Sequence, residues 1–159
     1  MSIYIQKVSE IALSNKYTKW YLNICSKANI RSSNRKEAKE LLGYVEGHHI
    51  LPKGFKIGGE TDKTNIVFLS AREHYVVHWL ATKMFKETYK AKMYYAFSFL
   101  VNASKFLIKN SYMYDLLKKC NSYDKVGIPL SEEHKEKLEN LNQYLDQNVK
   151  PIQKKLNKK

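Results

Sequence analysis

The sequence predicts an α+β fold in which a small strand–loop–strand–helix unit is embedded in a mainly helical single domain. Apolar residues recur at helical spacing through most of the 159 residues, but between Gly43 and Ser70 this spacing gives way to short β-branched runs. The length suits one domain, or one domain with a helical extension. We expect a helical segment over residues 1–43, the α/β unit over residues 44–85 and a helical region over residues 86–159.

The N-terminal segment contains two predicted helices. Asn34, followed three residues later by Glu37, has the spacing of a helix N-cap, and Gly43 marks the end of that short helix. An earlier amphipathic helix is expected over residues 15–30. Its apolar face is formed by Tyr17, Trp20, Tyr21, Ile24 and Ala28. We expect these aromatic side chains to belong to the core rather than to serve as platforms for base stacking.

The spacing of apolar residues changes twice within the central unit. Residues 44–51 form a short run between a glycine and a proline, which predicts a strand. Residues 52–64 hold three of the six glycines and predict a loop. Residues 65–69 predict a second strand, since they are rich in β-branched and aromatic side chains. Ser70 and Glu73 have the spacing of a capping box, and the helix they begin is expected to reach about residue 85.

The C-terminal region is predicted to be helical. Residues 89–109 are rich in aromatic residues, and residues 111–120 have the pattern of a further short helix. Ser131 is the expected N-cap of a last helix. We expect the lysine-rich tail after Pro151 to be frayed.

Composition narrows the class of partner. A formal charge of +13 favours a partner rich in phosphate, although AT-rich codon usage also explains an excess of lysine, asparagine and tyrosine. No apolar run is long enough to span a bilayer, and the first residues lack the pattern of a signal peptide, so we expect no membrane partner. The two cysteines form no CxxC motif. This is typical of reduced thiols in an intracellular protein, the cytoplasm of a host cell being the expected location.

Four of the five histidines fall within 31 residues, which is the strongest chemical signal in the chain. His74 and His78 are four apart on the predicted helix, so their imidazoles share one face and can converge on a divalent metal ion. His48 and His49 are adjacent on a predicted strand and point to opposite faces. One of them can join the pair as a third ligand, which leaves the other free for proton transfer in metal-assisted hydrolysis. Asn65 can bond across the glycine-rich loop and orient the base.

Each of these features also has a structural interpretation. A pair of histidines at this spacing often reflects helix packing alone, and adjacent histidines on a strand are usually one buried and one exposed. Asn65 alone is a common turn residue. All of these interpretations would have to hold together in one strand–loop–strand–helix unit, and we therefore favour the catalytic one.

At these residues the sequence resembles the HNH endonucleases. The stretch EGHHILPKGFKIGGETDKTNIVFLSAREHYVVH contains HH, 15 residues, N, eight residues, H, three residues and H. This spacing is similar to that of colicin-type DNase domains, whose first gap is typically one residue shorter. The phrases HHILPK, NIVFLSAREH and VVHWLATKMF resemble phage-encoded, free-standing HNH homing endonucleases more closely. The resemblance covers about residues 44–85, roughly a quarter of the chain.

The resemblance implies a ββα-metal (His-Me finger) fold and a metal-dependent DNA endonuclease. Carried over to this sequence, His49 would be the general base and Asn65 would hold the loop and orient His49. The metal ligands would be His48, His74 and His78. One divalent ion is implied, Mg²⁺ or Mn²⁺ for catalysis. Because many relatives have Asp in place of His48, three imidazoles could also favour Zn²⁺ or Ni²⁺.

Double-stranded DNA is the implied partner. Lys53 and Lys56 in the loop and Arg72 at the start of the helix are candidates for phosphate contacts. The segment GIPLSEEHKEKLENLNQ faintly resembles the SxEHKxK repeats of DNA-binding tails in phage homing enzymes. Two alternatives stay open, a non-catalytic zinc module that binds nucleic acid and a nuclease toxin domain. The sequence also leaves open whether the protein is a monomer or a homodimer.

Overall fold

The computed structural model describes residues 2–102 continuously. Beyond them it describes only residues 110–112, 114, 115, 118, 132, 136, 139, 140 and 143. The chain divides into two compact units, Met1–Leu100 and Val101–Lys159, and the first holds nearly all of the continuously described residues. The helices expected at residues 111–120 and from Ser131, and the tail after Pro151, lie wholly or mostly outside the described residues. The expected boundaries at residues 43/44 and 85/86 stay predictions.

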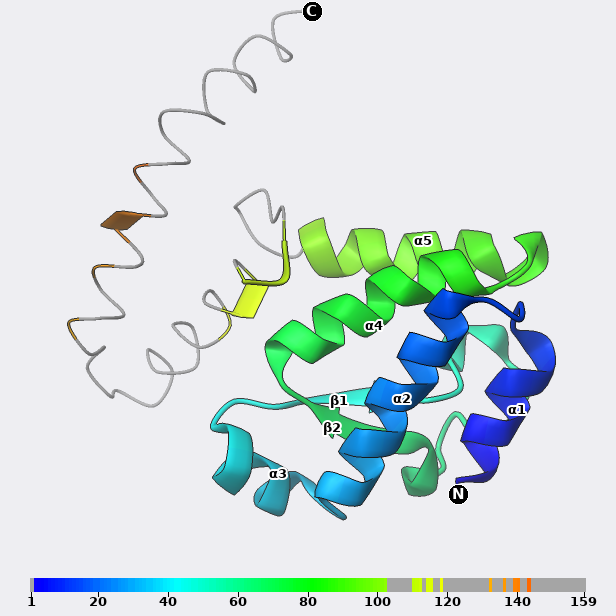
Figure 1. Cartoon of the computed structure of the whole chain (residues 1–159), viewed down its shortest axis with the longest axis horizontal. Coiled ribbons are helices and arrows are strands. Elements are labelled where there is room, and N and C mark those ends of the chain that lie inside the picture. Colours follow the sequence, from blue (N-terminus) through cyan, green and yellow to red (C-terminus); the bar gives the residue numbers. More distant parts are fainter. Residues whose placement is uncertain are drawn as a thin grey trace, which may run out of the picture. The chain divides into compact units, whose positions relative to one another are not determined.

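The first unit is mainly helical and contains one two-stranded hairpin (Figure 1). The elements follow in the order α1 (Ile3–Ile11), α2 (Lys16–Arg31), α3 (Arg35–Leu42), β1 (Glu46–His49), β2 (Ile66–Leu69), α4 (Ala71–Met84) and α5 (Glu87–Asn102), with 3₁₀ turns at Lys53–Phe55 and Lys63–Asn65. The hairpin and the helix directly after it form a ββα unit, so the predicted α+β class is confirmed. Helix α1 was not predicted.

The hairpin is shorter than the sequence predicted. Its antiparallel register pairs Glu46 with Leu69 at one end and His49 with Ile66 at the other. The prediction of one strand over residues 44–51 and of a second beginning at Asn65 was therefore too long. Beyond His49 the ladder is replaced by bonds from Asn65, whose side-chain Oδ1 accepts from the Leu51 N–H at 2.8 Å. Asn65 itself ends a 3₁₀ turn, from which its side chain can reach across the loop.

The helix caps predicted at Asn34 and Ser70 are confirmed, whereas Ser131 lies outside the described residues. The Asn34 side chain accepts from the backbone N–H groups of Lys36 and Glu37 at the start of α3. Ser70 and Glu73 form a complete capping box at the start of α4. The Glu73 carboxylate also accepts two bonds from Arg31, at 2.8 and 2.9 Å. Since Arg31 lies at the end of α2, this bidentate pair fixes the start of the histidine-bearing helix against α2.

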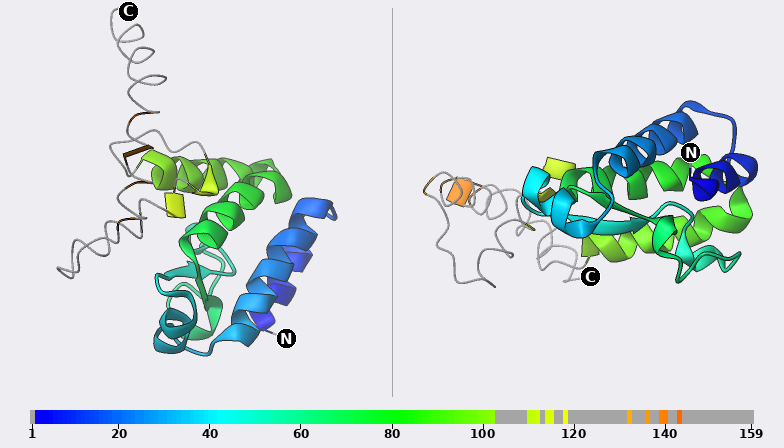
Figure 2. Two further views of the ribbon diagram at one scale, coloured as in Figure 1. Left: turned by 60° about the vertical axis from the view of Figure 1, so that its left-hand side comes forward. Right: turned by 90° about the horizontal axis from the view of Figure 1, so that it is seen from below.

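The core lies against one face of the hairpin, the face that carries Val67 and Leu69. Seen from below, the strands lie between α2 and α5 (Figure 2, right). The 3₁₀ turn after β1 is held to α5 by Phe55, whose ring stacks on Tyr89 with centroids 4.2 Å apart and meets Phe85 edge to face. Cys25 is a buried free thiol, and burial raises its pKa to about 12, which makes it chemically inert. The fold thus places α5 beside the end of β1.

Candidate metal centre and active site

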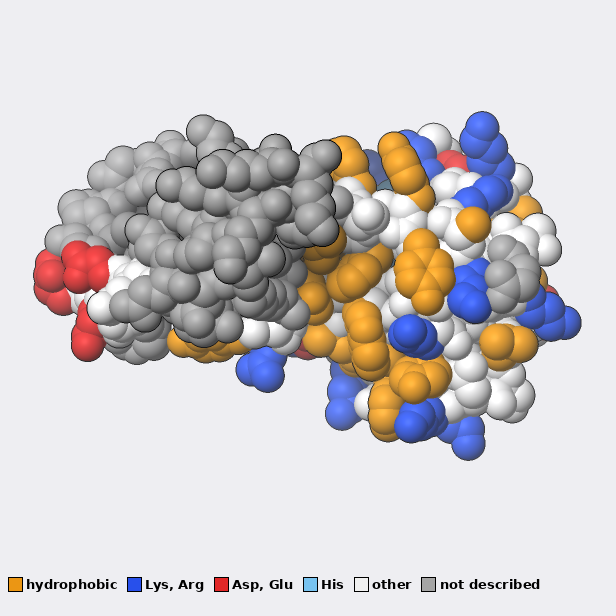
Figure 3. Space-filling view, turned by 90° about the horizontal axis from the view of Figure 1, so that it is seen from above, with side chains coloured by type: hydrophobic (Ala, Val, Ile, Leu, Met, Phe, Trp, Pro, Cys, Tyr) orange, Lys and Arg blue, Asp and Glu red, His pale blue; other side chains and the backbone are white. Residues whose placement is uncertain are grey.

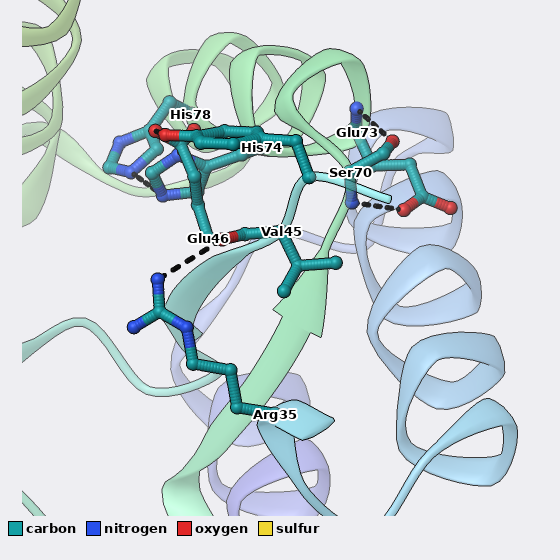
Figure 4. A network of polar contacts seen from close by, with 8 residues as sticks. Arg35, Val45, Glu46, Ser70, Glu73, His74 and His78 are labelled. Atoms are coloured by element: carbon teal, nitrogen blue, oxygen red, sulfur yellow. Dashed lines mark hydrogen bonds and ion pairs between the residues drawn. The ribbon is translucent and has the colours of Figure 1, made fainter. Parts of the chain in front are cut away.

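Three of the four clustered histidines come together in space. One nitrogen from each of His48, His74 and His78 lies within 4.8 Å of the other two. His48 comes from β1 and is buried, whereas the other two come from successive turns of α4. Figure 4 shows His74 and His78 pointing toward one another from the helix. The ββα unit therefore brings together the residues that the sequence predicted as ligands.

Glu46 orients His74 within this cluster. Its carboxylate Oε2 lies 2.8 Å from His74 Nδ1, so Nδ1 carries a proton and donates it to the carboxylate. The remaining nitrogen, Nε2, lies 3.2 Å from Nε2 of His78. Two nitrogens bound to one ion at about 2.1 Å are themselves roughly 3.0–3.4 Å apart, so this spacing fits a shared ion.

Tyr21 orients His48. The Tyr21 hydroxyl lies 2.8 Å from the carbonyl oxygen of Ile50 and 2.9 Å from Nε2 of His48. A carbonyl oxygen can only accept, so the single hydroxyl proton is donated to Ile50 and His48 Nε2–H donates to the hydroxyl oxygen. The lone pair of His48 is then on Nδ1. An arrangement in which a second group fixes the tautomer is typical of metal-binding histidines.

Burial keeps the imidazoles of His48 and His78 neutral. Desolvation lowers the pKa of His78 to about 3, with a further contribution from the neighbouring His74. Desolvation also lowers the pKa of His48 well below its ordinary value, followed by repulsion from His78, His74 and His49. A neutral imidazole has a lone pair to offer, and metal binding requires that form.

The donor set fits a divalent metal ion with open coordination positions. Within the described part of the chain, the cluster offers three imidazoles, and the nearby Glu46 carboxylate is engaged with His74. A structural zinc site is normally closed by four protein ligands, whereas a catalytic site keeps a position for water or substrate. Three nitrogen ligands suit Zn²⁺ and Ni²⁺.

His49 stands apart from the three ligands, in the same hollow of the surface. Its Nε2 lies 3.2 Å from the backbone carbonyl oxygen of Glu60, which can only accept, so this nitrogen carries the proton. The other nitrogen, Nδ1, then has the lone pair. The glycine-rich loop therefore orients His49 through its own backbone, at Glu60.

Asn65 fastens the two ends of that loop. Its side-chain Nδ2 donates to the carbonyl oxygens of Leu51 and Gly59, at 3.0 and 2.9 Å, while Oδ1 accepts from the Leu51 N–H. Asn65 is fully buried. Since Gly59 is the residue before Glu60, the connection of Asn65 to His49 runs through the loop backbone.

A hollow of about 700 Å³ opens over the histidines. Lys53 and Lys56 line it from the loop, and Lys92 and Tyr95 line it from α5. Tyr95 is 76% exposed, although it is a large aromatic residue. Arg72 is exposed in the first turn of α4 and does not belong to the lining.

Sequence reasoning missed several of these residues. Tyr21 was assigned correctly to the core, but its hydroxyl contact with His48, 27 residues away, has no signal in a helical pattern. Lys92 and Tyr95 reach the hollow only because α5 packs beside the loop. The prediction that Trp20 belongs to the core was wrong, since half of its surface is exposed.

Substitution of Tyr21 by Phe is expected to weaken metal binding about 10- to 100-fold. The variant keeps the ring in the core but leaves His48 free to adopt the other tautomer. Calorimetric titration with Ni²⁺ or Zn²⁺ measures the effect. Tyr17→Phe, which removes the same group one turn earlier on α2, is the matched control. Equal affinities in the two variants would show that the Tyr21 hydroxyl does not orient the ligand.

A two-stranded hairpin followed by a helix, with three imidazoles converging between them, defines a ββα motif with a candidate metal centre. Among curated proteins, probable mobile endonuclease E of Enterobacteria phage T4 is 32% identical over 126 residues, which are 77% of this chain and 81% of that protein. Probable mobile endonuclease D of the same phage is 43% identical over 68 residues, 43% of this chain. Probable mobile endonuclease C is 35% identical over 104 residues, 65% of this chain.

The chain therefore belongs to the family of the phage mobile endonucleases. It spans 24% of the length of endonuclease D and 45% of endonuclease C, but most of endonuclease E. No protein-family model matches the chain, and no solved structure matches it significantly. In the part of the chain that the structure describes, no helix has the length and apolar character needed to cross a membrane.

Proposed function

We propose that this protein is an HNH-type endonuclease that hydrolyses phosphodiester bonds of double-stranded DNA. The observation that carries the proposal is the division of four histidines into two groups. Three nitrogens gather around one point, and His49 lies beside them with a lone pair on Nδ1. Membership in the family of mobile endonucleases supports DNA as the substrate.

His49 is the general base in this proposal. Its Nδ1 takes a proton from a water molecule, and the oxygen of that water forms a new bond to phosphorus. The bond between phosphorus and the 3′ oxygen breaks, which leaves a 5′-phosphate and a 3′ oxygen that takes a proton from a solvent water and becomes a 3′-hydroxyl. His48, His74 and His78 would hold one divalent ion. When bound, this ion would stabilise the negative charge on phosphate and on the leaving oxygen.

The lysines around the hollow would bind the phosphates of the substrate. Lys53 and Lys56 on the loop side and Lys92 on α5 line the same space as the histidines. A phosphodiester backbone entering the hollow would therefore meet positive charge from the loop and from α5. Arg72, outside the hollow, is assigned to a more distant phosphate.

Removal of the ligand His78 tests the proposal. Wild-type protein is expected to nick or linearise a plasmid with at least one of Mg²⁺, Mn²⁺, Ni²⁺ or Zn²⁺, and EDTA is expected to stop it. His78→Ala should lose most of the metal affinity and at least about 10²-fold in rate, because the ion contributes to charge stabilisation at the phosphate. The measurements are gel-based plasmid cleavage and calorimetric metal titration.

Two outcomes would count against this function. Cleavage that persists unchanged in EDTA would separate the activity from the histidine cluster. Tight metal binding without cleavage under any ion would instead support the non-catalytic zinc module. Ser98→Ala, an exposed position on α5, serves as the control for handling and folding.

A further inference from the structure

Both tryptophans of the chain lie on the surface of the first unit. Trp20 is 50% exposed on α2 and Trp79 is 40% exposed on α4. Each meets the ring of Tyr17 edge to face, at centroid distances of 5.8 and 6.0 Å. Large aromatic side chains that stay exposed as a group often mark an interaction surface.

Lysines accompany these rings. The Lys16 Nζ lies 5.3 Å from the centre of the Tyr17 ring and 5.7 Å from that of Trp20. Next to Tyr17 is a second hollow, of about 400 Å³, between the start of α2, the end of α4 and the start of α5. Its lining includes Lys83, Lys86, Lys90 and Tyr94. Among the described residues, none that lines this hollow is acidic.

These residues form one surface, which we call the tryptophan–lysine patch. It consists of Lys16, Tyr17, Trp20, Trp79, Lys83, Lys86, Lys90 and Tyr94. Figure 3, which looks onto the α5 side, shows hydrophobic and basic side chains interleaved over the described part of the protein. On α4, Lys83 is five residues beyond His78, about 8 Å further along the helix and on another face. The patch is therefore separate from the hollow over the histidines.

We propose that the tryptophan–lysine patch binds the backbone of the DNA substrate outside the cleavage site. The charge of the patch is complementary to phosphate, and its aromatic rings can pack on sugars or bases. The lysines line a concave hollow, which a convex nucleic-acid backbone can enter and a flat bilayer cannot. A second copy of this chain is disfavoured as the occupant, because each copy carries a formal charge of +13. The choice of DNA rests on the proposed function.

The test is DNA binding by the full chain without metal, so that it does not depend on cleavage. A 30-base-pair duplex is titrated at several salt concentrations, and both anisotropy of the labelled DNA and tryptophan fluorescence are followed. Because both tryptophans lie in the patch, DNA bound there should quench the protein fluorescence. Each lost phosphate contact lowers the slope of log K against log salt by about 0.9.

The variant Lys16→Gln/Lys83→Gln/Lys86→Gln removes three exposed charges from the patch. We expect its salt slope to fall by about 2 to 3 and its binding at low salt to weaken at least ~10-fold. The matched control is Lys27→Gln/Lys36→Gln/Lys39→Gln, which removes the same charge from exposed positions of α2 and α3. The salt slope of the control should differ from that of the wild type by no more than about 0.9, the value of one phosphate contact.

Several results would overturn the proposal. Equal losses in both triple variants would mean that net charge alone attracts DNA, and no loss in the patch variant would mean that DNA docks elsewhere. A wild-type fluorescence change with vesicles containing phosphatidylserine, but none with DNA, would identify a membrane surface as the occupant. Metal-dependent cleavage is scored separately. Patch binding without cleavage would leave this inference standing and remove only the catalytic proposal.

Discussion

Replacement of His49 by Ala is expected to reduce the rate of metal-dependent DNA cleavage by ~10²-fold or more, while metal binding stays close to that of the wild type. The lower cleavage rate and the retained metal binding have different structural causes. His49 is not a member of the group formed by His48, His74 and His78, so its removal leaves three ligands in place. The substitution does remove the proton acceptor. In His49, Nε2 donates its proton to the Glu60 carbonyl oxygen, so the lone pair that could accept a proton from water is on Nδ1.

The measurement combines single-turnover cleavage at saturating metal with calorimetric metal titration. Thr61→Ala, exposed in the same loop, is the matched control and should cleave at the wild-type rate. Added imidazole should restore part of the activity of His49→Ala, since a diffusible imidazole can replace the missing side chain. A variant that cleaves normally would exclude His49 as the base, and one that also loses the metal would place His49 among the ligands.

The grouping of three histidines was the most predictable part of the candidate site. A pair of histidines four apart on a helix must share a face, and a capping box at Ser70 fixed where that helix begins. The third ligand was predicted only as one of two adjacent residues until the resemblance to HNH endonucleases assigned it. Strand alternation and a short hairpin depend on residues close together in the sequence, so the local sequence pattern was enough to predict them.

The groups that orient the ligands were harder to predict. The bond between Glu46 and His74 depends on how the hairpin packs against α4, which no local sequence pattern encodes. Tyr21 looks like any buried aromatic residue of an amphipathic helix. Trp20 follows the same spacing yet faces solvent, because the apolar stripe of α2 is wider than the surface that covers it. Such choices are made by tertiary packing, which a helical period does not encode.

Loss of the side chain that holds the loop, Asn65, is expected to lower both the stability of the protein and the cleavage rate. Asn65→Ala should lower the free energy of unfolding by about 2–4 kcal/mol, because it leaves the buried N–H and C=O of Leu51 without their side-chain partner. It should also slow cleavage at least ~10-fold while the folded variant still binds metal, since the loop carries the Glu60 carbonyl that orients His49. Chemical denaturation and single-turnover cleavage measure the two effects.

A purely structural role for Asn65 makes a different prediction, and the cleavage rate of the folded variant separates the two. If Asn65 only stabilises the fold, the variant at low temperature should cleave at the wild-type rate once it is fully folded. If Asn65 positions the base through Gly59 and Glu60, the folded variant should stay slow, because the bond that fixes the His49 tautomer is loosened. Asn23→Ala, exposed on α2, controls for the loss of an amide. The close approach of the loop to α1, where a side chain at Gly59 would collide with Tyr4, leaves the loop few ways to compensate.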